Sequence, residues 1–301
     1  MSSFDVYSRI RNQLSVLMCW VCLVLFALPC EGQSPIQTND ARGASENANR
    51  VERTIQFICQ DRTRDPKATI PIDRMATHPL MPLTTSRVIA GRDRAEAMLP
   101  VAKRLLPFAL SRVAANNGLE PLNAQWILER IQSITAIRPD VREGDNASWH
   151  PGEPNVIVFG TVFLNALRSD EAMLAVLSHE ITHAINGTDH ALQPIFSRVN
   201  QKSSVGLAAA EELVSELVGI EVVRDYISQT SSQGSQNRRL ARSLQKNCVS
   251  LDLSDAHHLS PRHTMRMLVE LDPKLRFTTT HKPKNKQPKH KPKPKRNRKR
   301  S

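Results

Sequence analysis

Aromatic residues are scarce in this sequence: Phe, Trp and Tyr together make up 4% of its 301 residues. Hydrophobic residues nevertheless reach 40%. This is enough to build a core, and Leu, Val, Ile and Ala must therefore fill it. A chain of this length suits one large domain or two small ones.

Acidic residues are absent from the end of the chain. Residues 281–301 contain eleven Lys and Arg, so that of the formal net charge of +12 only about +1 remains for the other 280 residues. We expect residues 276–301, the basic tail, to be disordered, because its charges repel one another and its prolines lack a backbone N–H. The tail either remains solvated without a partner or makes an electrostatic contact with an anionic polymer or membrane. No aromatic residue lies between its cations to stack on bases, and specific nucleic-acid binding is not expected.

Long apolar runs are also missing. The apolar run from Leu14 to Leu28 has 15 residues and would span about 22 Å as a helix, which is short for a bilayer. Arg9 and Arg11 precede it, and turn-forming residues up to Gly32 follow it. This pattern predicts a secretory signal peptide over residues 1–32, with an uncleaved membrane anchor as the alternative. We therefore expect the protein to be exported, either periplasmic or secreted.

Cysteine is used sparingly, and no C-x-x-C pair lies outside the signal region, so a cysteine zinc site is not expected. Cys19 and Cys22 would leave with the signal peptide. If cleavage follows Gly32, Cys59 and Cys248 remain. They form either one disulfide, as an oxidising compartment allows, or two free thiols.

The periodic segments lie in the middle of the chain. Residues 33–90 are polar and then rich in proline, and we expect a flexible linker and a loop-rich lead-in there. Residues 91–275 form the folded domain, of class α+β and mainly helical, with a small sheet. The expected elements are a helix over 95–115 that Pro100 and Pro107 kink or divide, a short helix over 121–131, a strand over 156–159, a helical turn over 163–167, and helices over 170–185, 206–227 and 261–271.

The helix over 170–185 carries the motif H-E-x-x-H at His179, Glu180 and His183. Residues four apart share one helix face, so both imidazoles can bind one metal ion. Glu180 then lies beside the metal, where it can take a proton from a zinc-activated water as general base. A surface helix is the plain alternative. The other residues of this helix are apolar around much of its circumference, however. The helix should then be buried, and buried polar groups need partners.

A catalytic zinc site needs a third protein ligand. Asp189 and His190 follow the motif closely, but Asn186-Gly187 ends the helix before them, which favours a solvated turn. The apolar helix over 206–227 offers Glu211, Glu212 and Glu216.

Of these three glutamates, we predict Glu212 as the ligand. Glu216, one turn further on, would accept the free N–H of a ligating histidine.

These residues resemble the gluzincin zinc metallopeptidases, which include HtpX-like proteases, Oma-type proteases and the CAAX prenyl endopeptidase. The resemblance covers about residues 95–271. It is carried by SDEAMLAVLSHEITHAING (169–187), by Glu212-Leu-Val-Ser-Glu216, by NASW (146–149) and by DAHHLSPRHTMRML (255–268). It implies a zincin-like fold in which Asn146 and Ala147 begin an edge strand that binds substrate.

The resemblance also implies that His258 steadies the oxyanion. Three features depart from the family pattern. Glu216 replaces an aspartate, Leu259 replaces a proline, and the segment between the two motifs is shorter.

The sequence thus predicts a zinc metalloendopeptidase with one Zn²⁺ per chain and a protein or peptide substrate. The alternatives are a catalytically inactive zincin-like binding module and a zinc amidase acting on cell-wall peptides. Glu180 argues against the inactive module, which has no need of a general base.

Overall fold

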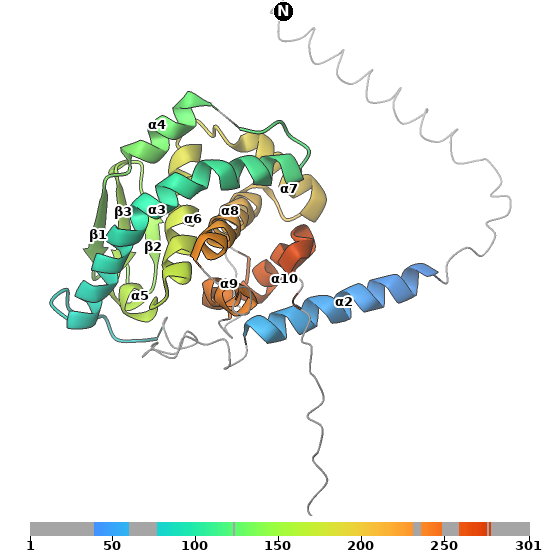
Figure 1. Ribbon diagram of the computed structural model, residues 1–301, viewed down its shortest axis with the longest axis horizontal. Coiled ribbons are helices and arrows are strands. Elements are labelled where there is room, and N and C mark those ends of the chain that lie inside the picture. Colours follow the sequence, from blue (N-terminus) through green and yellow to red (C-terminus); the bar gives the residue numbers. More distant parts are fainter. Residues whose placement is uncertain are drawn as a thin grey trace, which may run out of the picture. The chain divides into compact units, whose positions relative to one another are not determined.

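Figure 1 shows the computed structural model, which describes residues 39–59, 77–122, 124–230, 236–248, 259–275 and 277. The chain divides into two units, residues 1–46 and 47–301, and the fold below is that of the second. The expected signal peptide, most of the basic tail and His258 lie outside the described residues. None of the helices that are described has the length and apolar character needed to cross a membrane.

The second unit is mainly helical with one three-stranded sheet, as expected for the α+β class. Its elements in chain order are the C-terminal part of α2 (Asn39–Ile58), α3 (Ser86–Asn116), α4 (Gln125–Ser133), β1 (Ala136–Asp140), β2 (Ala147–Trp149), β3 (Val156–Gly160), α5 (Thr161–Ala166), α6 (Asp170–Asn186), α7 (Gln193–Ser203), α8 (Leu207–Thr230), α9 (Gln236–Leu244), η3 (Gln245–Asn247), α10 (Pro261–Leu271) and η4 (Pro273–Leu275).

The core is built around α6 and α8, which pack side by side, with α3 against both (Figure 1). Ser169 caps α6 by accepting a hydrogen bond from the Ala172 N–H, and two acidic residues occupy its first turn. The helix ends at Gly187, whose φ of +56° favours glycine. Nearly every residue of α6 is buried, so the helix is enclosed by other elements rather than laid on the surface.

The close contact of α6 and α8 depends on Gly219. A Cβ at this position would lie only 2.9 Å from the carbonyl oxygen of Ala175 on α6. Glycine therefore lets the two helix backbones approach closely at this point.

The sheet lies beside α6, with strand order β1-β3-β2. β1 pairs with β3 in parallel and β2 pairs with β3 antiparallel, so β2 is an edge strand. The expected strand over 156–159 is present as β3, whereas β1 was not anticipated. Pro139 interrupts the alternating sequence pattern of a strand in β1. Proline is tolerated there because β1 is the other edge strand.

The lead-in over residues 33–90 differs from the expected linker and loops, because α2 lies within it. Val51, Ile55 and Ile58 follow a helical spacing and are buried. A disulfide between Cys59 and Cys248 joins the end of α2 to the segment after η3. The sequence left this pairing open.

Of the two possibilities for the first long helix, a kink or two shorter helices, the division is wrong, because α3 runs continuously through Pro100 and Pro107. Each proline costs a helix interior about 3 kcal/mol. One face of α3 is buried along its whole length, and this packing outweighs the cost.

Candidate metal centre

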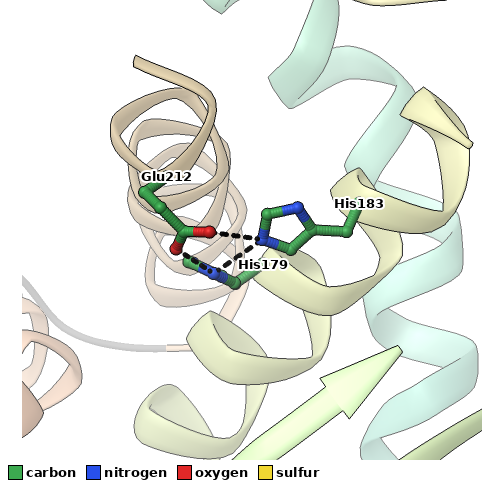
Figure 2. A group of neighbouring side chains, drawn as sticks. All are labelled: His179, His183 and Glu212. Atoms are coloured by element: carbon green, nitrogen blue, oxygen red, sulfur yellow. Dashed lines mark hydrogen bonds and ion pairs between the residues drawn. The ribbon is translucent and has the colours of Figure 1, made fainter. Parts of the chain in front are cut away.

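Two histidines of α6 lie next to each other inside the protein (Figure 2). His179 and His183 are one helical turn apart, and their Nε2 atoms are 3.1 Å from each other. His179 is 8% exposed. The His183 side chain is 19% exposed, and its ring nitrogen faces that of His179 at a distance at which one metal ion can bind both.

Glu212 reaches the same point from α8 (Figure 2). Its Oε2 lies 3.2 Å from His179 Nε2 and its Oε1 lies 3.4 Å from His183 Nε2. One ligand atom from each of the three residues can be chosen so that all lie within 4.8 Å of one another. The group therefore could hold a metal ion.

A second carboxylate lies behind each imidazole. Glu216 Oε1 is 3.3 Å from His179 Nδ1, an ion-pair distance without hydrogen-bond geometry. Glu211 Oε1 is 3.1 Å from His183 Nδ1 and also accepts a hydrogen bond of 2.9 Å from the Asn186 side chain. A hydrogen bond such as that between His183 and Glu211 orients the ring of a metal-ligating histidine and fixes its tautomer, and Glu216 lies near the corresponding nitrogen of His179.

The charges around His179 act strongly on its pKa. Burial lowers the pKa of His179, and so does Lys246. Glu212 and Glu216 outweigh both and raise it from 6.5 to about 10. For Glu216, burial alone would raise the pKa, but Lys246 and His179 outweigh burial and hold it well below its usual range. The neighbouring carboxylates thus favour the protonated form of His179, and Lys246 and His179 favour the ionised form of Glu216.

Glu180 follows His179 on α6 and is 7% exposed. Burial raises the pKa of its carboxyl group, and the neighbouring His179 and His183 only partly oppose this effect. A carboxylate with a raised pKa is better suited to exchange protons near neutral pH. The raised pKa therefore fits the role expected of Glu180.

Asp189 does not join the metal group. It forms an ion pair with Arg130 on α4, whose guanidinium also donates to the carbonyl oxygen of Ile185 near the end of α6. His190 lies in the same turn, with a φ of +52°. The structure thus places both residues in a turn, as the end of the helix at Asn186-Gly187 indicated.

The predicted substrate-binding residues lie at the start of β2. The Asn146 carbonyl accepts a hydrogen bond of 2.7 Å from the Gly160 N–H, and Ala147 pairs with Phe159 of β3. β2 packs on α6. Its outer edge pairs with no other strand among the described residues.

Sequence reasoning missed three contributors to the site. Glu211 was considered only as a rival ligand and Asn186 only as a helix end, although their proximity to the motifs was a usable signal. Lys246 lies on η3, far from either motif, and no pattern in the sequence points to it.

The chain matches no protein-family model, no curated protein and no solved structure.

Proposed function

We propose that the protein is a zinc-dependent metalloendopeptidase. The observation that carries the proposal is the convergence of His179, His183 and Glu212 next to Glu180. Zinc bonds to nitrogen of about 2.0–2.1 Å imply ligand atoms about 3.3 Å apart in a tetrahedron. The two Nε2 atoms are 3.1 Å apart, close to this spacing, and each has one oxygen of Glu212 near it, Oε2 at 3.2 Å from His179 and Oε1 at 3.4 Å from His183. Two imidazoles and one carboxylate are also a ligand set of catalytic zinc.

Bound Zn²⁺ would supply Lewis acidity and lower the pKa of a water molecule toward neutrality. Glu180 would accept the proton of that water and deliver it to the leaving amine. Its burial keeps bulk water from competing for the same carboxylate. Glu216 and Glu211 would hold the imidazoles with their Nε2 atoms toward the metal. In this proposal His258, which lies outside the described residues, keeps its expected role of steadying the oxyanion.

The substrate would be an extended peptide segment. β2 is an edge strand beside α6 with an unpaired outer edge among the described residues, and a peptide can add to such an edge through main-chain hydrogen bonds. Asn146 and Ala147 would contact the peptide first, next to the helix that carries Glu180. The resemblance to gluzincin peptidases supports the same arrangement. An exported enzyme with a basic tail would meet such substrates outside the cytoplasm.

Metal analysis of four proteins tests the ligand set. We expect wild type and Asp189→Asn to bind one Zn²⁺ per chain, and Glu212→Gln to lose it. Glu211→Gln should retain zinc with reduced affinity, because Glu211 contacts His183 rather than the metal. If only Asp189→Asn lost zinc, the assignment of Glu212 would be wrong.

Cleavage of an unfolded protein such as casein tests the reaction. Glu180→Gln should retain zinc and lose cleavage, since it removes the base and none of the ligands. Zinc-loaded wild type that cleaves no protein would contradict the endopeptidase. Hydrolysis of cell-wall peptides by the same preparation would then indicate the amidase, and its absence would indicate a binding module.

A further inference from the structure

Lys246 of η3 contacts the metal centre through Glu216. Its Nζ lies 2.6 Å from Glu216 Oε1. The same oxygen lies 3.3 Å from Nδ1 of His179. The three side chains therefore form a row that ends at a ligand of the proposed zinc ion.

All three side chains are largely withdrawn from water. Those of His179 and Glu216 are each 10% exposed, and that of Lys246 is 15% exposed. A buried carboxylate is costly unless charged or hydrogen-bonding partners surround it. When His179 binds a metal through Nε2 it must be neutral, and it then offers Glu216 only an N–H. Lys246 is then the cation that remains beside this carboxylate among the described residues.

The position of Lys246 does not depend on the metal centre. Helix α9 packs on both α6 and α8 and leads directly into η3. On one side of Lys246, Gln245 is buried and donates a hydrogen bond to the Ile58 carbonyl. On the other side, Cys248 is held by its disulfide to Cys59. The ammonium group is thus attached to a segment that other contacts already fix.

We propose that Lys246 is a positioning residue of the metal centre. By its ion pair it fixes the Glu216 carboxylate, which in turn fixes the His179 ring with Nε2 toward the metal. This inference rests on the metal site of the proposed function. It adds a residue that neither motif contains.

A Lys246→Met variant tests the role, because methionine keeps an unbranched chain and removes the charge. Metal affinity would be measured on the full chain with its disulfide intact, using Zn²⁺ against a competing chelator and the visible absorption of bound Co²⁺. We expect Lys246→Met to bind Zn²⁺ about 10–100-fold more weakly, the usual effect of removing such a contact. The Co²⁺ spectrum should change as well, because the His179 ring is no longer held.

Lys103→Met is the matched control. Lys103 also makes tertiary contacts, donating to the Gln132 and Ile134 carbonyls, but it contacts none of the metal-site residues. We expect wild-type metal affinity and an unchanged Co²⁺ spectrum from this variant. Lys246→Arg keeps the charge and should recover most of the affinity. A loss in Lys103→Met as large as in Lys246→Met would overturn the proposal.

The double variant Glu216→Gln/Lys246→Met separates positioning from simple destabilisation. If Lys246 acts through Glu216, the double variant binds metal no more weakly than Glu216→Gln alone. Additive losses, or a Lys246→Met protein with wild-type affinity, overturn the proposal. Wild type that binds zinc without cleaving protein refutes the proposed function and leaves this inference standing. If wild type cleaves protein but Lys246→Met keeps wild-type metal affinity, this inference is refuted and the proposed function stands.

Discussion

Gly219→Ala should weaken the metal centre without touching any ligand. The added Cβ would lie 2.9 Å from the Ala175 carbonyl oxygen on α6. Carbon–oxygen contacts of this kind are normally no shorter than about 3.3 Å, so α8 and α6 must separate locally by about 0.4 Å. Ala175 is one turn before His179, and Gly219 is on the same helix as Glu212. The separation therefore acts directly between the two helices that carry the ligands.

Two opposing terms set the magnitude. Alanine favours a helix interior over glycine by about 1 kcal/mol. Overpacking of a close contact costs about 1–3 kcal/mol, so we expect a net loss of about 1 kcal/mol in the free energy of unfolding. Metal–ligand distances hold within about 0.2 Å. A shift of about 0.4 Å exceeds that tolerance, and zinc affinity should fall at least tenfold.

Urea unfolding and chelator competition measure the two effects on the same preparations. Gly152→Ala is the control, since no atom lies within 4 Å of its added Cβ. It should change neither quantity appreciably. A Gly219→Ala protein that is more stable than wild type and binds zinc equally well would refute the reasoning. The close approach at Gly219 would then not set the distance between the ligands.

Three further outcomes are expected. Replacing Cys59 and Cys248 by serine should lower the free energy of unfolding, measured in urea, by about 5 kcal/mol, because the disulfide closes a loop with a sequence separation of 189; a loss below about 1 kcal/mol would contradict this. Zinc affinity should rise about tenfold per pH unit between about pH 6.5 and 8, because zinc must displace the proton of His179, whose pKa is about 10 without metal. A flat pH profile by chelator competition would show that His179 is already neutral. Arg130→Ala should lower the melting temperature by removing the contacts to Asp189 and the end of α6, with zinc content unchanged; loss of zinc would place this turn in the metal site.

Local spacing explains why part of the site could be predicted from the sequence. His179, Glu180 and His183 lie on one helix with recognisable ends, so their relative positions follow from helix geometry alone. Ser169 and Gly187 mark the two ends of that helix, and the structure begins and ends α6 there. The relative placement of these three side chains therefore needed no tertiary information.

The choice among the glutamates of α8 needed more than spacing. Glu211, Glu212 and Glu216 are all on one apolar helix, and only the rotation of α8 against α6 decides which carboxylate faces which nitrogen. The structure brings Glu212 to both Nε2 atoms, and it brings Glu211 and Glu216 to the opposite nitrogens. Helix periodicity supported the pairing of Glu212 with Glu216, but it could not place Glu211.

The remaining features depend on contacts between distant parts of the chain. The polar composition around residue 40 obscured the apolar face of α2, whose Val51 and Ile55 become buried only against other elements. β1 is defined by its parallel pairing with β3, which no local pattern specifies. Lys246 lies next to Glu216 only because α9 and η3 pack against the helices of the site. Each of these features depends on tertiary packing that outweighs the local signal.

The row formed by His179, Glu216 and Lys246 bears on whether the His179 ring is held for metal binding. Replacing a buried ion pair by apolar residues is often neutral or stabilises a protein by about 1–4 kcal/mol. A fold that needed only to present a surface would gain nothing from burying these three groups between α6, α8 and η3. Their burial is explained if the centre must hold the His179 ring in one orientation, with Nδ1 beside Glu216 and Nε2 available to a metal. A metal ion at Nε2 would impose this requirement, so the row supports the proposed metal site, whether the centre is catalytic or only binds zinc.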